Sequence, residues 1–178
     1  SGLEAAVLKA AASGALVFGV CGGYQMLGRT VSDPDQVEAA GVTKIAGMDL
    51  LPMDTVFHGE KVQTQTSGTF SDIEGMLASL NGIHYEGYEI HMGRSEVSLN
   101  PVTGCGNVYG SYIHGIFDAP GVTDTILRAL CQQKGIDFAS LGTFDMKSYK
   151  EQQYDKLADA VREGLDMELV YKILNREV

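Results

Sequence analysis

The chain has 178 residues, of which 44% are apolar and 20% are charged, and its net charge at pH 7 is −10. This composition predicts a globular chain with a core, and the acidic balance argues against nucleic acid and anionic membrane as partners, since both bind basic surfaces. No apolar run approaches the roughly 18 residues of a membrane span. Cys21, Cys105 and Cys131 form no CxxC pair, which argues against disulfides and a metal site and predicts a cytoplasmic protein.

The first part of the chain predicts a strand between two helices. Residues 3–12 have the pattern of an amphipathic helix, residues 15–20 (ALVFGV) that of a short buried strand, and residues 24–30 that of a second helix. Residues 31–47 are predicted to be mostly loop, with a turn signal at Asp33-Pro34-Asp35.

The middle of the chain is rich in predicted strands, and helices follow it. The strands are expected at 48–57, 61–70, 84–97 and 106–117, with the first two joined near His58-Gly59. The helices are expected at 122–135, 149–164 and 167–177. Thr123 or Asp124 is the expected N-cap of the first of these helices, Gly135 its stop, and Asp166 the N-cap of the last. The pattern predicts an α/β fold with a mixed sheet.

The segment Gly19-Val20-Cys21-Gly22-Gly23 has the spacing of a nucleophile elbow, in which a strand turns sharply into a helix. Glycines two residues before and two after Cys21 remove the Cβ atoms that would clash in so tight a turn. The helix N-terminus predicts a lowered thiol pKa, and the N–H of Gly22 is placed to donate to an oxyanion. The alternative is a tight turn with an inert cysteine, and the spacing alone leaves both interpretations open.

A nucleophilic cysteine needs a base, and the candidates are the four histidines. His114 ends a predicted strand and precedes a glycine, which is a suitable position for a general base. The alternative is a core histidine that is satisfied by its neighbours. His84 and His91 are seven residues apart and would point to opposite faces of one strand, a poor geometry for a shared metal.

Three segments, GVCGGYQMLG, EGYEIHMGR and YGSYIHGIFD, resemble the C-terminal glutamine amidotransferase domain of the cobyric acid synthase family. The resemblance implies a class I amidotransferase fold, a flavodoxin-like mixed sheet with flanking helices, here N-terminally truncated. It implies that Cys21 attacks the side-chain amide of glutamine, that His114 is the base, that Gly22 binds the oxyanion and that Gln25 lies near the substrate.

The resemblance also implies a destination for the ammonia. In this family it serves the ATP-dependent amidation of adenosylcobyrinic acid a,c-diamide to cobyric acid in cobalamin biosynthesis. ATP and Mg²⁺ are expected in an upstream synthetase domain of the same enzyme, and no cofactor in this chain. Residues 1–178 are then a partial amidotransferase domain that contacts the corrinoid only indirectly. Because only 20 residues precede Cys21, the isolated chain is expected to be weakly active or inactive, and a bare sheet edge favours a homodimer.

One position departs from the general class I pattern. The residue two positions after His114 is Ile116, where a glutamate that orients the histidine is usual. The candidates for a third member are Asp118 and Glu89, and each is alternatively a solvated carboxylate.

The tyrosine-rich segment has two interpretations. Tyr88, His91 and Arg94 are candidates for an interdomain face or an ammonia exit, and the alternative is an ordinary strand.

Four other interpretations remain open from the sequence. Two are close relatives of the first, cobyrinic acid a,c-diamide synthase and the lipid II amidotransferase subunit. The third is a non-catalytic interaction module, and the fourth is a redox-sensing cysteine protein.

Overall fold

The computed structural model describes residues 2–95, 100–119, 121–141 and 145–177, without the side chains of Cys105 and Lys147. The chain divides into two compact units, Ser1–Ser140 and Leu141–Val178, and each is described by itself. The α/β class and the mixed strand directions predicted from the sequence are confirmed in the first unit. Its strands form two sheets rather than one.

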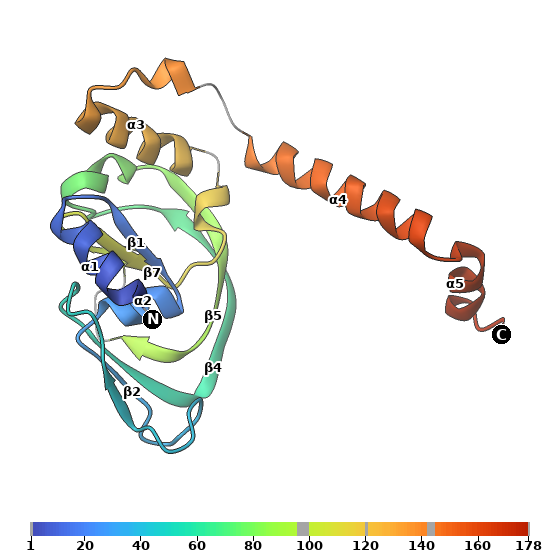
Figure 1. The fold of residues 1–178 in the computed structure, drawn as a ribbon, viewed down its shortest axis with the longest axis horizontal. Helices are drawn as coiled ribbons and strands as arrows, with labels where there is room; N and C mark the ends of the chain where they lie inside the picture. The colour runs from blue at the N-terminus through green and yellow to red at the C-terminus, as the bar shows by residue number, and fades with distance from the viewer. Residues whose placement is uncertain (1, 96–99, 120, 142–144, 178) are drawn as a thin grey trace. The chain divides into compact units, whose positions relative to one another are not determined.

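The first sheet carries the predicted elbow. Strand β1 (Val17–Val20) pairs in parallel with β7 (Val108–Ser111), and β7 pairs antiparallel with β6 (Thr103–Cys105), in the order β1-β7-β6. Helices α1 (Leu3–Ala12) and α2 (Gly22–Leu27) contact β1, as Figure 1 shows.

Helix α2 approaches the first sheet closely because β7 contains a glycine. A Cβ at Gly110 would overlap the ring of Tyr24, so the absence of a side chain lets this ring lie directly against the sheet.

The second sheet is built around two long strands. Its order is β3 (Lys44–Ala46), β2 (Thr30–Ser32), β4 (Asp54–Thr69) and β5 (His84–Ser95). β2 runs parallel to β4, and the other two pairings are antiparallel.

Residues 31–47 are mostly loop, as predicted, apart from the end of β2 and β3. Two other sequence predictions fail in this sheet. The predicted strand 48–57 begins only at Asp54, since the backbone N–H groups of Met48 and Leu50 donate to the last carbonyls of α2 instead. The chain also does not turn at His58-Gly59: β4 runs on through these residues, with a shift of register against β5 between Phe57 and Val62.

The predicted strand 106–117 is also too long. β7 ends at Ser111, whose hydroxyl accepts a hydrogen bond from the N–H of Ile113 at 3.0 Å and so replaces the ladder. Gly115 then adopts a positive φ of 76°, and a 3₁₀ turn, η2 (Ile116–Asp118), follows.

Helix α3 (Val122–Lys134) follows η2 and packs on a second 3₁₀ helix, η1 (Gly75–Leu80). The N-cap of α3 is Gly121, not Thr123 or Asp124. The predicted stop at Gly135 is confirmed by its positive φ of 66°, and η3 (Phe138–Leu141) comes next.

The core of the first unit has two parts. One part lies between α2 and the segment that follows it, and its buried members are Tyr24, Leu27, Leu51, Met53 and Val108. The other lies under α3 and η1, and includes Phe70, Leu77, Leu80, Tyr109, Ile113, Ile116 and Val122. The first part thus includes residues of α2 directly after the elbow, and the second includes residues of the segment after β7.

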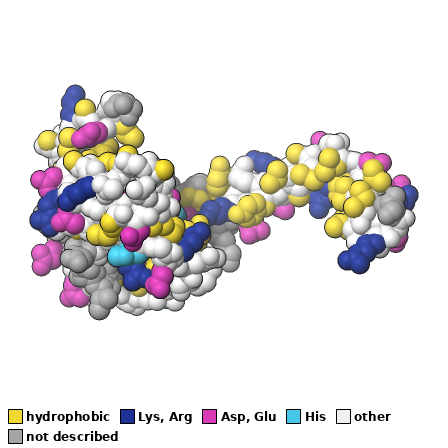
Figure 2. Space-filling model, turned by 90° about the horizontal axis from the view of Figure 1, so that it is seen from below, with side chains coloured by type: hydrophobic (Ala, Val, Ile, Leu, Met, Phe, Trp, Pro, Cys, Tyr) yellow, Lys and Arg dark blue, Asp and Glu magenta, His cyan; other side chains and the backbone are white. Residues whose placement is uncertain are grey.

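The second unit consists of helices α4 (Met146–Gly164) and α5 (Met167–Leu174). The predicted N-cap of α5 is confirmed, because the carboxylate of Asp166 accepts from the N–H of Leu169 at 3.1 Å. Apolar side chains remain exposed along both helices, as Figure 2 shows. No helix within the described ranges is long and apolar enough to cross a bilayer.

Candidate functional site

Cys21 lies at a strained turn between β1 and α2. Its φ is 51° and its ψ is −112°, a conformation that a residue with a Cβ rarely adopts. The elbow predicted from the glycine spacing is therefore confirmed. Such strain persists only where the surroundings enforce it, and it is concentrated at functional sites.

The surroundings that enforce the turn are backbone contacts. The N–H of Cys21 donates to the carbonyl of Ser111 at 2.8 Å, and its carbonyl accepts from the N–H of Gln25 at 3.0 Å. A Cβ at Gly19 would stand 2.7 Å from the backbone of Gly23 and Tyr24, so only glycine lets α2 fold back this closely on β1.

The thiol of Cys21 is partly buried. Its Sγ donates to the carbonyl oxygen of Ile90 on β5 at 3.7 Å. Burial raises the pKa of the Cys21 thiol above its ordinary value, and the hydrogen bond from the Gly22 backbone only partly offsets this. The predicted fall in pKa is therefore wrong, because the loss of solvent on burial outweighs the hydrogen bond at the start of α2.

His114 lies beyond the end of β7, rather than on a long strand. Its N–H donates to the carbonyl of Tyr88 at 2.8 Å, and its carbonyl accepts from the N–H of Tyr88 at 3.1 Å, which makes an isolated antiparallel bridge to β5. The Nε2 atom of His114 is buried and has no hydrogen-bond partner among the described residues.

Cys21 and His114 meet the same stretch of β5. The carbonyl of Ile90 accepts from the thiol, and the backbone of Tyr88, two residues earlier, pairs with His114, so both contacts are made at the same edge of β5. Two residues of a strand span about 7 Å. No hydrogen bond joins the two groups within the described residues, and such contacts are often long before a substrate binds.

Gln25 is buried beneath the elbow. Only 7% of the residue is exposed, and its Nε2 donates to the hydroxyl of Tyr112 at 3.5 Å. Gly93 makes room for it, because a Cβ there would overlap the Gln25 amide.

A polar network that the sequence analysis missed continues from Gln25. The hydroxyl of Ser95 lies 2.7 Å from that of Tyr112 and 2.7 Å from that of Thr55. The sequence contained a signal for it: Glu89, His91 and Ser95 alternate along β5 and so share one face.

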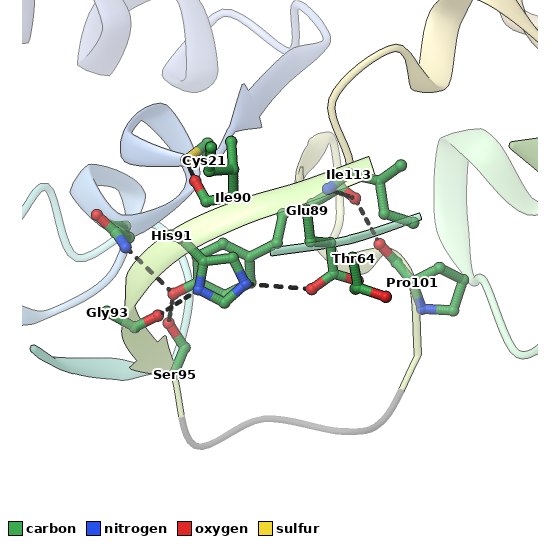
Figure 3. A network of polar contacts seen from close by, with 12 residues as sticks. Cys21, Thr64, Glu89, Ile90, His91, Gly93, Ser95, Pro101 and Ile113 are labelled. Carbon is green, nitrogen blue, oxygen red and sulfur yellow. Dashed lines mark hydrogen bonds and ion pairs between the residues drawn. The ribbon is translucent and has the colours of Figure 1, made fainter. Parts of the chain in front are cut away.

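His91 belongs to this network and is almost fully buried. Its Nδ1 contacts the carbonyl oxygen of Gly93 at 2.7 Å and its Nε2 contacts Glu89 Oε2 at 3.1 Å, as Figure 3 shows. Its ring stacks on Tyr112 with centroids 3.9 Å apart. The candidate third member Glu89 thus contacts His91.

Two hollows flank β5. A cavity of about 290 Å³ lies between the sheets and is lined largely by hydroxyl groups and Glu89. A groove of about 470 Å³ contains Tyr88, His114, Gly115 and Asp118. Asp118 therefore shares a groove with His114, although β7 ends at Ser111 and Asp118 lies in η2.

Arg94 lies away from both hollows. Its guanidinium donates to Glu60 Oε2 at 3.2 Å, and both side chains are more than half exposed. An exposed pair of this kind contributes little to stability. Among the described residues, no three histidine, cysteine or acidic side chains are grouped so that they could hold a metal ion.

Tyr24, which lines the cavity, is expected to ionise late. Burial raises its pKa to about 12, despite a hydrogen bond with Thr103 that lowers it, and Tyr112 adds to the rise. Because the pKa of Tyr24 is higher in the folded than in the unfolded state, its neutral phenol contributes about 3 kcal/mol to the free energy of unfolding below pH 10. This contribution is lost as the pH rises through about 12.

Absorbance titration of the phenols should show this late step. The step should disappear in Tyr24→Phe and persist in Tyr154→Phe, which changes an exposed tyrosine of α4. A late step that survives Tyr24→Phe would contradict the assignment.

Comparisons with known proteins identify similar sequences. The family described as CobB/CobQ-like glutamine amidotransferase domain matches residues 1–122. The cobyric acid synthase of Lachnoclostridium phytofermentans is 48% identical over all of this chain and 39% of its own length. Those of Ruminiclostridium cellulolyticum and Dehalococcoides mccartyi are 43% and 39% identical, each over all of this chain and 38% of their own length. The chain thus spans well under half the length of these relatives.

Proposed function

The chain belongs to the family of CobB/CobQ-like glutamine amidotransferase domains, and we propose on that basis that it hydrolyses the side-chain amide of glutamine at Cys21. The observation that carries the proposal is the strained elbow, which holds Cys21 at the carboxyl end of β1 beside the segment that carries His114. The carboxyl ends of parallel strands are where open α/β sheets bind their ligands.

The reaction begins with the thiol. Cys21 Sγ attacks the side-chain carbonyl carbon of glutamine, and its proton moves to Nε2 of His114. The N–H of Gly22 donates to the oxyanion that forms. Gln25 lies one helical turn after Cys21, beneath the elbow, where its N–H donates to the Cys21 carbonyl. The carbon–nitrogen bond then breaks as the nitrogen takes the proton from His114. Ammonia departs, and a γ-glutamyl thioester remains on Cys21. Water activated by the same imidazole cleaves the thioester to glutamate and restores the thiol.

The raised pKa of the Cys21 thiol supports a base in this scheme. A thiol that is neutral at pH 7 is a weak nucleophile, so it has to lose its proton as it attacks. His114 Nε2 is buried and unpaired among the described residues, which leaves it available to accept that proton.

The ammonia has a proposed use. The relatives are named cobyric acid synthase and are much longer than this chain. We propose that the rest of such an enzyme uses ATP and Mg²⁺ to activate corrinoid carboxylates for amidation. The relatives' names favour this over cobyrinic acid a,c-diamide synthase and lipid II amidation.

The proposal is tested by His114→Ala. We expect glutamate release from L-glutamine, and labelling of Cys21 by a diazo-ketone analogue of glutamine, to slow by about 10²- to 10⁴-fold, the usual contribution of a general base. His84→Ala, which removes an exposed histidine at the start of β5, is the control and should behave as wild type. A wild-type chain that the analogue does not label at Cys21, or a His114→Ala variant with unchanged rates, would contradict the proposal.

A further inference from the structure

We propose that Tyr88 is the positioning residue of His114, and that its ring orients the imidazole where a carboxylate would otherwise do so. The inference rests on the proposed function, because it assigns a role within the same site. It starts from the two contacts that Tyr88 makes with His114, one through the backbone and one through the ring.

The backbone contact fixes the place of His114. The two residues exchange both hydrogen bonds of an antiparallel bridge, at 2.8 and 3.1 Å, although no strand continues on either side of His114. Gly87 allows this approach, because a Cβ there would overlap the carbonyl oxygen of His114. The bridge therefore attaches the segment after β7 to β5 at His114, in addition to the contacts that Tyr112 makes with the same strand.

The ring contact fixes the orientation of the imidazole. The rings of Tyr88 and His114 lie 5.0 Å apart between centroids, with 9° between their planes. Stacking restricts rotation of the imidazole about its side-chain bonds. It also favours the imidazolium that forms when the thiol proton arrives, since a cation is attracted to the face of an aromatic ring.

Two side chains at positions that could orient His114 are engaged elsewhere, and Asp118, which shares its groove, is included in the test below. The carboxylate of Glu89 contacts His91. Ile116 is only 1% exposed and packs in the core under α3. Tyr88 itself is 45% exposed, so its ring is not part of the hydrophobic core. The ring instead stacks on the imidazole of His114.

The test compares a reaction that needs the base with one that does not. Capture of the diazo-ketone analogue at pH 7 requires the thiol proton to leave, whereas iodoacetamide at strongly alkaline pH meets a thiol that is already ionised. We expect Tyr88→Leu to slow the first about fivefold, as the loss of an aromatic pair predicts, and to leave the second unchanged. Tyr88→Phe keeps the ring and should react as wild type, and so should the control His84→Ala.

A double-mutant comparison separates positioning from a general structural effect. In a His114→Ala background, Tyr88→Leu should cause no further loss, because there is no imidazole left to orient. The inference is overturned if Tyr88→Leu reacts as wild type or if it slows both reactions equally. It is likewise overturned if Tyr88→Leu lowers the rate of capture by the same factor in the His114→Ala background as in wild type. It is also overturned if Asp118→Asn shows the predicted pattern in its place. A wild-type chain that is not labelled at Cys21 would instead refute the proposed function itself.

Discussion

Replacing Cys21 with serine is expected to abolish both glutamate release and labelling by the glutamine analogue, with a loss of at least about a thousandfold in rate. A serine hydroxyl gives up its proton far less readily than a thiol. The surroundings of residue 21 disfavour loss of the proton further, because partial burial raises the pKa even of the native thiol. The Gly22 N–H donor remains, but it has no developing oxyanion to stabilise.

The same substitution should leave the fold intact. Serine is close to cysteine in size, and the strain at residue 21 lies in the backbone, which the surrounding hydrogen bonds enforce. Thermal unfolding of Cys21→Ser should therefore resemble that of wild type. Cys131→Ala is the matched control, because Cys131 is a buried cysteine on α3, away from the elbow. It should keep full activity, and peptide mapping should locate the label on Cys21. Label on another cysteine, or turnover by Cys21→Ser, would contradict the assignment of the nucleophile.

Replacing Gly19 with alanine is expected to lower the free energy of unfolding by about 3 kcal/mol or more, at the upper end of the cost of overpacking. The added Cβ would stand 2.7 Å from the backbone carbon of Gly23 and from the backbone nitrogen of Tyr24. Backbone atoms cannot move aside as a flexible side chain would. Helix α2 would have to shift away from β1, and the elbow would open with it.

The matched control is Gly23→Ala, two residues beyond Cys21. Nothing lies within 4 Å of a Cβ at Gly23, and the residue is inside α2. Alanine there should be neutral or stabilising by up to about 1 kcal/mol, because it favours the helix. Urea unfolding of both variants measures the difference, and the rate of Cys21 labelling reports on the elbow. Equal unfolding midpoints for the two variants would show that the close approach at Gly19 is not needed.

Features that depend on a few neighbouring residues were predictable from the sequence. The turn at Cys21 follows from the glycines at positions 19 and 23, and the positive φ of Cys21 confirms it. The stop of α3 at Gly135 and the N-cap of α5 at Asp166 follow from the same kind of local rule. The glycine spacing alone therefore locates the bend that holds the candidate nucleophile.

Features that depend on distant partners were not predictable in this way. Residues 48–53 are apolar enough for a strand, but the end of α2 takes up their backbone donors. His58 and Gly59 have the composition of a turn, but pairing with β5 carries β4 past them. In both places a partner far along the chain outweighs the local preference.

The sequence by itself determined that a cysteine stands at a glycine-flanked bend and that a histidine follows it about 90 residues later. Only the tertiary structure decided the surroundings of each group: a thiol whose burial raises its pKa, and an imidazole bridged and stacked by Tyr88. The physical reason is that a bend is a property of a few consecutive residues. Burial and strand register are set by whatever the rest of the chain brings alongside.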